Sequence, residues 1–286
     1  MIKRVLAIHD ISCVGKCSST VALPVISAAG IECSLLPTAL LSTHTGGFTN
    51  YTFLDLTKEI KKIFRHFESL DLSIDAFYSG YLGDKKQINF LIKKIKAYKK
   101  TGTTYICDPV MADNGKLYPA FDEDFVSEIR KLVSYSDVVI PNLTEASFLL
   151  NKEFKNTYSK EEIKSILNEL CDLGPKTAII TGVSFKENEL GVMAYDSITE
   201  EYYEFYTEKI PGYYHGTGDL ISSAIVGCIL NDINLQKTLQ ISTIFTFNTI
   251  KQAYDDKLEP RYGVEFEKFL YDYSKSIKKE IDEWFH

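Results

Sequence analysis

The most constraining feature of this chain is an alternation of short apolar runs with segments of helical period. The runs are rich in β-branched and aromatic residues and are mostly apolar on both faces, which is typical of strands buried inside a parallel sheet. Strands that alternate with helices in this way form right-handed βαβ units. The runs lie at 4–9, 32–36, 76–78, 103–107, 137–140 and 176–180, and they predict an α/β fold around a mainly parallel sheet.

The segments between these runs carry apolar residues at i, i+3, i+4 and i+7, the pattern of an amphipathic helix. One such segment spans 60–67, and two more span 88–95 and 163–170. Asp84 precedes the second segment and has Gln87 three residues further on, and Ser159 precedes the third and has Glu162 at the same spacing. These are capping boxes or close variants, so we expect helices to begin there.

The rhythm changes near residue 189. Two runs, 190–195 and 201–206, predict an antiparallel hairpin at one edge of the sheet. Further on, the segments 220–230, 235–254 and 264–284 carry apolar residues at helical spacing. No linker rich in Pro, Gly or Ser divides the chain, so we expect one domain over residues 1–286.

Composition argues against several classes of function. The formal net charge of -7 disfavours nucleic acid as the main partner, because phosphate backbones attract basic surfaces. No apolar run reaches the ~20 residues of a membrane-spanning helix, and the first residues show no signal-peptide pattern. We therefore expect a cytoplasmic protein without a membrane partner. The six cysteines form no Cys-x-x-Cys pair, so we expect free thiols and no zinc site.

Polar residues directly follow four of the predicted strands. Ligands of open parallel sheets bind beyond the carboxyl ends of the strands, so these residues should meet at one edge. Ordinary loop polarity accounts for any one of them, but less well for the whole set. They are Asp10 and Ser12 after the first strand, Asp108 and Asp113 after 103–107, Asn142 and Glu145 after 137–140, and Thr181 and Gly182 after 176–180.

The sharpest single motif is His215-Gly216-Thr217-Gly218-Asp219, followed by an apolar helical segment. The two glycines allow the backbone to approach a ligand closely, and the start of the helix presents unpaired N–H groups. This combination predicts an anion site with Asp219 beside it, ionised at neutral pH. The same residues also fit an ordinary tight turn with an acid at a helix start. The motif alone does not separate the two interpretations.

A second candidate for phosphate binding, Gly15-Lys16-Cys17-Ser18, fails on inspection. A P-loop needs a glycine five residues before its Gly-Lys pair and Ser or Thr directly after it. Asp10 and Cys17 occupy those two positions. We therefore expect a strand-to-helix turn with an exposed Lys16. The first strand is also not followed by the Gly-x-Gly-x-x-Gly pattern of dinucleotide-binding folds.

Taken as an ordered set, the motifs resemble those of a known enzyme family. The segment 216–219 resembles the anion-hole and catalytic-base signature of the ribokinase superfamily, and 142–145 resembles its Asn-x-x-Glu element. The segments 108–115, 42–46 and 79–83 narrow the resemblance to the pyridoxal/pyridoxamine kinase branch, which converts the B6 vitamers into 5′-phosphates. The resemblance runs from Val5 to about Tyr254.

The resemblance implies a Rossmann-like three-layer α/β/α sandwich, a homodimer, and the use of ATP and Mg2+, often with a monovalent cation such as K+. The substrate it implies is a small heteroaromatic alcohol, a B6 vitamer phosphorylated on its 5′-hydroxymethyl group. Asp219 would be the general base, and the backbone of Gly216, Thr217 and Gly218 would stabilise the transferred phosphoryl group.

The resemblance also assigns binding residues. ATP contacts are implied for Asp108, Asn142, Thr181, Gly182 and Thr217. Magnesium contacts are implied for Asp113 and Glu145. Substrate contacts are implied for Ser12, His44, Thr45, Tyr81 and Asp219.

Three positions depart from the pattern of the branch. The segment 10–12, Asp-Ile-Ser, stands where many members have Gln or Asn and then Ser. Ala112 replaces a common Gly, and His215 stands where small or apolar residues are usual. These departures leave open which vitamer is preferred. A hydroxymethylpyrimidine kinase of the same fold remains an alternative, as does a non-catalytic ligand-binding relative, although Asp219, Asp113 and Glu145 are all present.

Overall fold

A computed structural model of the chain describes residues 2–70 and 72–284. Over these residues the main sheet has eight strands in the order β13-β12-β11-β10-β7-β6-β1-β3. All neighbours from β3 to β11 pair in parallel, and β12 and β13 pair antiparallel as an edge hairpin. The strands are β1 (Arg4–Ile8), β3 (Glu32–Leu35), β6 (Ala76–Ser79), β7 (Thr104–Cys107), β10 (Val138–Val139), β11 (Thr177–Val183), β12 (Glu189–Asp196) and β13 (Glu201–Glu208).

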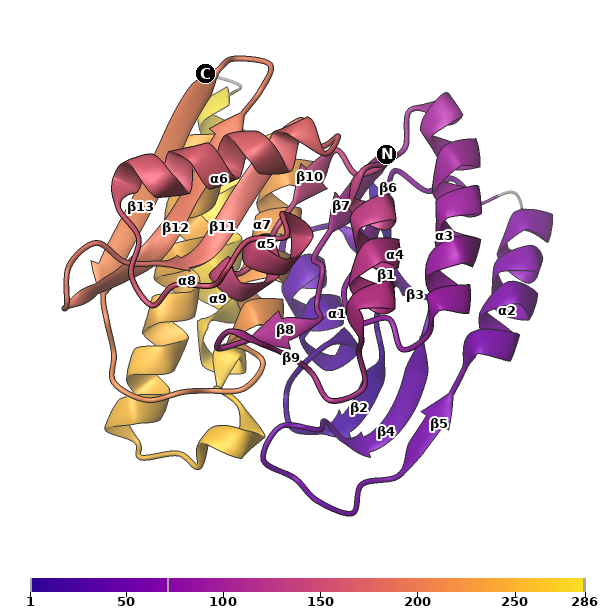
Figure 1. Cartoon of the computed structure of the whole chain (residues 1–286), viewed down its shortest axis with the longest axis horizontal. Coiled ribbons are helices and arrows are strands. Elements are labelled where there is room, and N and C mark those ends of the chain that lie inside the picture. Colours follow the sequence, from indigo (N-terminus) through magenta and orange to yellow (C-terminus); the bar gives the residue numbers. More distant parts are fainter. Residues whose placement is uncertain (1, 71, 285–286) are drawn as a thin grey trace.

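Helices cover both faces of this sheet, and each face has its own apolar core. Along β1, Val5 and Ala7 face one core while Leu6 and Ile8 face the other, as expected for a strand buried on both sides. The first core holds α1 (Ser19–Ala28), α7 (Thr217–Leu230), α8 (Leu235–Asp255) and α9 (Leu270–Trp284). The second holds α2 (Thr57–Ser69), α3 (Lys85–Tyr98), α4 (Glu123–Val133), α5 (Leu143–Leu149) and α6 (Lys160–Asp172), some of which lie on the near side of the sheet in Figure 1. The predicted three-layer α/β/α sandwich is confirmed.

The helix starts follow their sequence signals. Ser159 and Glu162 form a complete capping box at α6. At α3, Asp84 accepts a hydrogen bond from the N–H of Lys86, while Gln87 reaches back to the N–H of Gly83 and so makes only a variant of the box. Short 3-10 helices span Lys99–Thr101, Pro260–Tyr262 and Phe266–Phe269.

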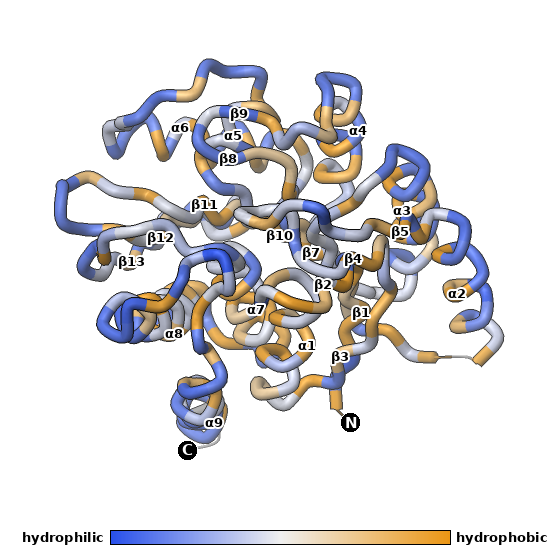
Figure 2. The backbone as a smooth tube through the Cα atoms, turned by 90° about the horizontal axis from the view of Figure 1, so that it is seen from below, coloured by the Kyte–Doolittle hydropathy of each residue, from blue (hydrophilic) through white to orange (hydrophobic). Residues whose placement is uncertain are grey.

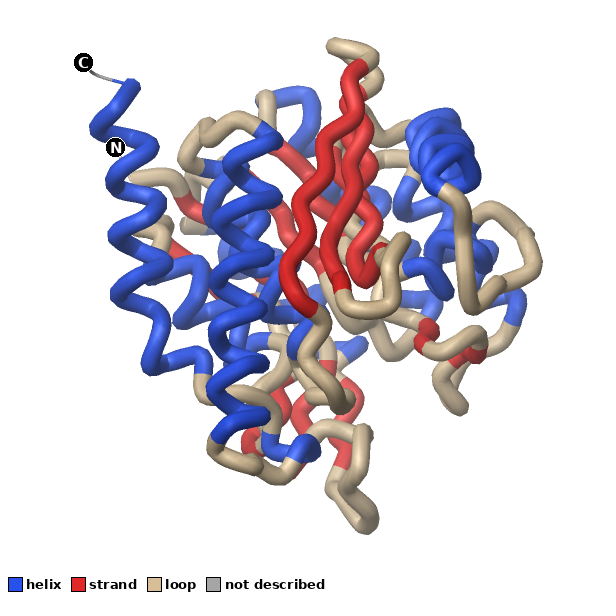
Figure 3. The backbone as a smooth tube through the Cα atoms, turned by 90° about the vertical axis from the view of Figure 1, so that its left-hand side faces the viewer, coloured by secondary structure: helices blue, strands red, loops and turns tan. Residues whose placement is uncertain are grey.

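The helices differ in how deeply they are buried. Figure 2 shows α1 and α7 as largely hydrophobic tubes in the interior, while α9 at the outside is largely hydrophilic. The hairpin of β12 and β13 runs beside α8, as Figure 3 shows. None of the helices in the described part of the chain is both long and apolar enough to serve as a membrane span.

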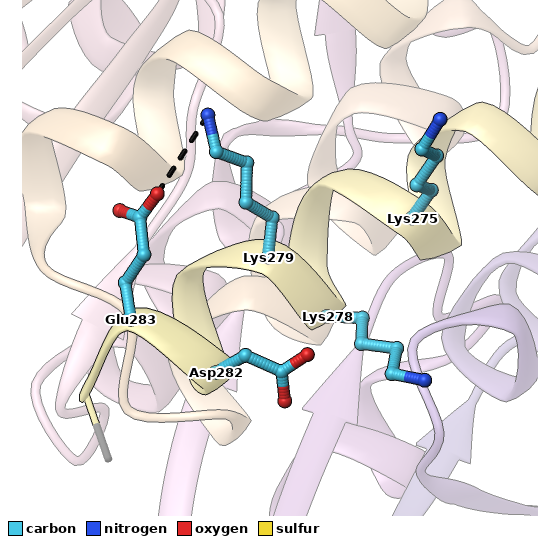
Figure 4. A pocket seen from close by; sticks show the side chains of 5 residues that line it. All are labelled: Lys275, Lys278, Lys279, Asp282 and Glu283. Carbon is cyan, nitrogen blue, oxygen red and sulfur yellow. Dashed lines mark ion pairs between the residues drawn. The ribbon is translucent and has the colours of Figure 1, made fainter. Parts of the chain in front are cut away.

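The end of α9 carries a charged face. Figure 4 shows Lys275, Lys278, Lys279, Asp282 and Glu283 there, with Lys279 and Glu283 paired at 3.7 Å. Glu280 differs, because it turns toward α8 and pairs with Lys237 at 3.0 Å. Exposed pairs of this kind add little stability, so this surface is a solvated helix face.

A second sheet was missed by the sequence patterns. It consists of β2 (Ile11–Val14), β4 (Ala39–Thr43) and β5 (Phe53–Asp55) in the order β2-β4-β5. A small hairpin, β8 (Ala112–Asp113) and β9 (Lys116–Leu117), turns through Asn114 and Gly115, both with positive φ. Both additions lie beyond the carboxyl ends of the parallel strands, where they help to enclose a cavity.

Candidate active site

A cavity of ≈600 Å³ lies at the carboxyl edge of the parallel strands. Its wall contains Asp10 after β1, Asp108 after β7, Asn142 after β10 and Thr181 on β11. The four predicted strand ends therefore do converge, which ordinary loop polarity does not explain. Every other site residue that the sequence predicts also lines this cavity: Ser12, His44, Thr45, Tyr81, Asp113, Glu145, Gly182, Gly216, Thr217, Gly218 and Asp219.

The start of α7 forms one wall of the cavity. Gly216 is its N-cap with φ +77°, and no side chain caps the first N–H groups. A Cβ at Gly216 would lie 1.9 Å from the backbone oxygen of Lys16, so only glycine fits between this turn and the 15–18 turn. Free N–H groups at the positive end of a long helix form an anion site. The expected anion hole at 216–218 therefore has the required geometry.

Asp219 lies in the first turn of α7, and its side chain is 15% exposed. Burial raises the pKa of Asp219 to about 7, a backbone hydrogen bond from Ser18 lowers it, and the nearby Asp10 raises it further. With this pKa about half of the Asp219 carboxylates are ionised at neutral pH, rather than nearly all of them as expected, because the sequence does not show the burial of this side chain. A carboxylate with a pKa near 7 is a stronger base, well placed to accept a proton from an alcohol.

Asp10 organises the wall next to Asp219. Its carboxylate accepts hydrogen bonds from the hydroxyls of Ser12, at 2.8 Å, and Ser18. Burial raises the pKa of Asp10, and the two serine hydroxyls oppose this shift. Ser18 has a positive φ of 52° and directly precedes α1, so the bond to Asp10 holds a strained residue in place. Because the Ser12 hydroxyl donates to Asp10, its oxygen can accept a hydrogen bond from a ligand.

His44 and His215 lie side by side on the same wall, with ring centroids 5.1 Å apart. The Nδ1 atom of His44 accepts from the N–H of Gly46, so Nε2 carries the proton and donates to the backbone oxygen of Arg261 at 2.7 Å. A Cβ at Gly46 would lie 2.4 Å from the ring of His215. The two imidazoles thus join the 44–47 loop to the segments before α7 and around 261.

The Asn-x-x-Glu element is a capping box at the start of α5. Asn142 and Glu145 bond to each other's N–H groups, and Glu145 also accepts from the N–H of Met111 at 3.1 Å. The side chain of Asn142 donates to the oxygen of Ala112. The element therefore holds the β8 hairpin and presents Asp113 to the cavity, where the hydroxyl of Tyr213 donates to Asp113 at 2.6 Å.

Another part of the cavity wall includes Thr181 and Gly182 at the end of β11. The register between β11 and β12 shifts between Thr181 and Val183. Gly182 has φ +73°, and the space where a Cβ would lie is open. Thr181 also forms an isolated parallel β-bridge with Asn142. This irregular strand end leaves room for a ligand to approach the backbone.

The cavity is strongly acidic. Within the described residues its wall contains six carboxylates and no lysine or arginine: Asp10, Asp108, Asp113, Glu145, Glu208 and Asp219. Burial first, and then the charges of Glu145 and Asp219, raise the pKa of Asp108. Burial raises the pKa of Glu145 to about 8. Such a wall accepts a triphosphate only together with a cation.

The residues present fit Mg2+ as that cation. The described part of the chain has no group of three or more His, Cys, Asp or Glu side chains arranged around a common metal site. Mg2+ does not need one, since it keeps several waters and binds through one or two carboxylates plus substrate phosphates. Asp113 and Glu145 supply hard oxygen atoms of this kind.

Several contacts in this region were not predicted. Tyr213, Cys17 and Ser18 line the cavity, and the pairing of Tyr213 with Asp113 joins positions a hundred residues apart in sequence. Lys16 does not line the cavity and is partly buried rather than exposed, because it pairs with Glu267 at 2.8 Å. The predicted strand-to-helix turn at 15–18 is confirmed, since β2 ends at Val14 and α1 begins at Ser19. All six cysteines are free, as expected.

Known proteins with similar sequences and structures are kinases. The model of the phosphomethylpyrimidine kinase family matches residues 22–262. A Bacteroides thetaiotaomicron protein described as a phosphomethylpyrimidine kinase, crystallised with pyridoxal, is 36% identical, with a TM-score of 0.91 and coverage of 96% of each chain. The pyridoxal kinase of Lactobacillus plantarum is 29% identical, with a TM-score of 0.86 and coverage of 96% of this chain and 97% of its own. The pyridoxal kinase of Dictyostelium discoideum is 26% identical over 270 residues, which cover 89% of this chain and 87% of its own.

The family match spans most of the chain, and the two solved structures superimpose on nearly all of it. The sequence match and the structural matches therefore point to the same group of kinases. The chain belongs to the phosphomethylpyrimidine kinase family, within the ribokinase-like fold that pyridoxal kinases share, and it is a kinase that phosphorylates an alcohol group.

Proposed function

We propose that this kinase transfers the γ-phosphoryl group of ATP to the 5′-hydroxymethyl group of a B6 vitamer. The observation that carries the proposal is the start of α7, where the partly buried Asp219 lies beside uncapped N–H groups in a cavity of ≈600 Å³. A base and an anion hole on one turn can act on an alcohol and on the phosphoryl group that it receives. A relative with bound pyridoxal, 36% identical, supports a pyridine alcohol as the acceptor.

The roles that the family resemblance implies are compatible with the positions of these residues in the cavity wall. Asp219 takes the hydroxyl proton, and the N–H groups of 216–218 stabilise the charge that develops on the phosphoryl oxygens. Ser12 accepts a hydrogen bond from the ring of the substrate, because its own proton is donated to Asp10. His44, Thr45 and Tyr81 complete the substrate wall, and Asp108, Asn142, Thr181, Gly182 and Thr217 contact the nucleotide.

Asp113 and Glu145 would hold Mg2+, directly or through water. When bound, the ion supplies positive charge that neutralises the triphosphate and the acidic wall. Asn142 and the two backbone bonds of Glu145 keep this part of the wall in place. A monovalent cation such as K+ follows from the family resemblance.

A substrate panel tests the proposal. ATP consumption is measured with pyridoxal, pyridoxamine, pyridoxine, hydroxymethylpyrimidine and ribose under the same conditions. We expect turnover with at least one vitamer to exceed that with hydroxymethylpyrimidine by at least about tenfold, a difference of about 1.4 kcal/mol in transition-state binding. The match of the phosphomethylpyrimidine kinase model favours hydroxymethylpyrimidine as the second candidate. Faster turnover of hydroxymethylpyrimidine would select that candidate, and turnover of none of the five would leave a non-catalytic relative.

A homodimer is part of the same proposal, and the second sheet offers the surface for it. Leu40 pairs with Ile11 on one side and Leu54 on the other, so the three side chains form one row on one face of the sheet. Leu40 is 39% exposed and Leu54 is 56% exposed. Their neighbours on the opposite face, Ser12 and Leu41, line the cavity. An apolar row at the rim of an active site is a surface that association would cover.

The expected result for Leu54→Glu is a shift from dimer to monomer, measured by sedimentation velocity at micromolar concentration. A buried carboxylate without a partner would outweigh the apolar contacts of such an interface. Ile198→Glu is the matched control, because Ile198 is 72% exposed at the tip of the β12–β13 hairpin. It should leave the dimer intact. A wild-type protein that sediments as a monomer would exclude the dimer.

Two broader expectations belong to the proposal. The chain would act as a single kinase domain over residues 1–286, which is supported by a cavity whose wall draws on segments from Asp10 to Ile250. It would act in the cytoplasm, as its free cysteines suggest.

A further inference from the structure

His9, the residue that follows β1, is fully buried directly behind the active-site cavity. Neither of its ring nitrogens has a hydrogen-bond partner among the residues that the structure describes. Burying such groups without partners destabilises a fold, and an apolar residue of similar size would avoid the penalty. A histidine at this position therefore requires an explanation other than packing.

The surroundings of the ring fix its place. Nδ1 of His9 lies 4.0 Å from Oδ1 of Asp219. The ring of Tyr78 lies on another side, with centroids 4.5 Å apart and an interplanar angle of 60°. A Cβ on Gly80 would lie 2.3 Å from Cε1 of His9, so the backbone of Gly80 forms a third wall. The ring is thus held next to Asp219 and has little room to turn away.

The charged groups around Asp219 suggest a role for His9. Asp10 raises the pKa of Asp219, and the charge of Asp219 in turn raises the pKa values of four other acids: Cys17, Tyr78, Asp108 and Tyr118. All five are acids, and none of them in its charged form favours an ionised Asp219. Burial lowers the pKa of His9 to about 3, so its imidazole stays neutral and carries one N–H group. A neutral donor can stabilise a carboxylate without adding a buried charge.

We propose that His9 is a positioning residue for the catalytic base. Its ring N–H at Nδ1 turns to Asp219, holds the carboxylate toward the acceptor hydroxyl, and favours its ionised form. The proposal rests on the proposed role of Asp219 as the base. The distance of 4.0 Å is longer than a hydrogen bond, and hydrogen bonds in active sites often tighten only when substrates are bound.

Three variants distinguish the effect of the N–H donor of His9 from the effect of the volume of its ring. His9→Leu removes the donor. His9→Asn keeps an N–H at the position of Nδ1, because both nitrogens are attached to Cγ, whereas His9→Gln moves the donor to the position of Nε2. The readouts are the pH dependence of kcat, the KM values for ATP and for the vitamer, and the thermal midpoint.

In His9→Leu we expect the midpoint of the rise of kcat with pH to move upward by about one pH unit, so that kcat at pH 6 falls by about tenfold. The KM values for ATP and for the vitamer should both change less than about twofold. His9→Asn should restore the midpoint, and His9→Gln should resemble His9→Leu. The thermal midpoint of His9→Leu should not fall, because two unpartnered buried nitrogens are removed. The proposal would be overturned if His9→Leu had the same pH midpoint of kcat as wild type, or if the Asn and Gln variants had equal pH midpoints. The Asn and Gln comparison decides the matter even if the Leu variant does not fold.

A double variant distinguishes the proposed role of His9 from the proposed role of Asp219 as the base. In an Asp219→Asn background, His9→Leu should cause no further loss of turnover, because the group that it acts through is gone. Further loss there would show that His9 acts by another route and would overturn the proposal. Normal turnover in Asp219→Asn alone would instead reject Asp219 as the base.

Discussion

Asp219→Asn is expected to lower kcat by about a thousandfold while the protein still binds MgATP with an affinity close to that of wild type. Asparagine matches aspartate in shape, so the uncapped start of α7 and its anion hole remain. The amide cannot accept the proton of the acceptor hydroxyl. Transfer of the phosphoryl group to a hydroxyl that keeps its proton is slow. Single-turnover measurements with saturating substrates, together with nucleotide titration, separate the chemical step from binding.

The pH profile supplies an independent check on the same residue. Because burial raises the pKa of Asp219 to about 7, wild-type kcat should rise with pH and reach half its plateau near that value. In Asp219→Asn this rise of kcat with pH should be absent.

The stability of the wild-type protein should change with pH in the opposite direction to kcat. The folded state holds the Asp219 proton more tightly than the unfolded state, so stability is lost as the pH rises through about 7, and Asp219→Asn should be the more stable protein at pH 8.

Asp272→Asn is the matched control, since Asp272 also lies in the first turn of a helix, α9, but is exposed. If Asp219 were only a helix-start acid, both variants would lose a few tenths of a kcal/mol of stability and both would keep full turnover. Near-normal kcat in Asp219→Asn would remove it from the mechanism. Equal loss of kcat in both variants would point to an effect on folding.

Most of the fold could be predicted from the sequence because its central strands are buried on both faces. In a run such as 176–180 the three residues 178–180 are apolar and buried, and this pattern indicates a strand without knowledge of its neighbours. The strands at 11–14 and 39–43 do not have this signal, since they carry Ser, Thr and Cys and cover only the rim. Their pairing depends on the tertiary fold, so the second sheet could not be predicted from local patterns.

The residues of the site could be predicted, but not their electrostatics. Asp108, Asn142 and Thr181 follow strands whose carboxyl ends share one edge, and topology alone brings them together. The pKa of Asp219 depends on burial and on Asp10, which stands more than two hundred residues earlier in the chain. The unpartnered His9 was counted as part of a strand. Its importance becomes visible only when the space around Gly80 and Asp219 is known.

Gly216→Ala is expected to lower both stability and turnover strongly. The added Cβ would lie 1.9 Å from the oxygen of Lys16, and the backbone there is in the left-handed region, with φ +77°. The left-handed conformation alone costs a non-glycine residue about 1 kcal/mol. The overlap with Lys16 involves backbone on both sides, so one of the two turns must move, and we expect a total cost of about 3 kcal/mol or more.

Gly30→Ala separates these two costs, because Gly30 has almost the same φ, +79°, with open space where the Cβ would be. It lies between α1 and β3, away from the cavity, so it should lose only about 1 kcal/mol of unfolding free energy and keep full turnover. In Gly216→Ala the N–H donors at the start of α7 shift with the turn, and a displacement of about 1 Å is enough to reduce kcat about a hundredfold. Urea unfolding and kcat measured on both variants test this difference. Equal stability losses would mean that the 15–18 turn yields easily, and an unchanged kcat in Gly216→Ala would show that the N–H groups of this turn do not stabilise the transferred phosphoryl group.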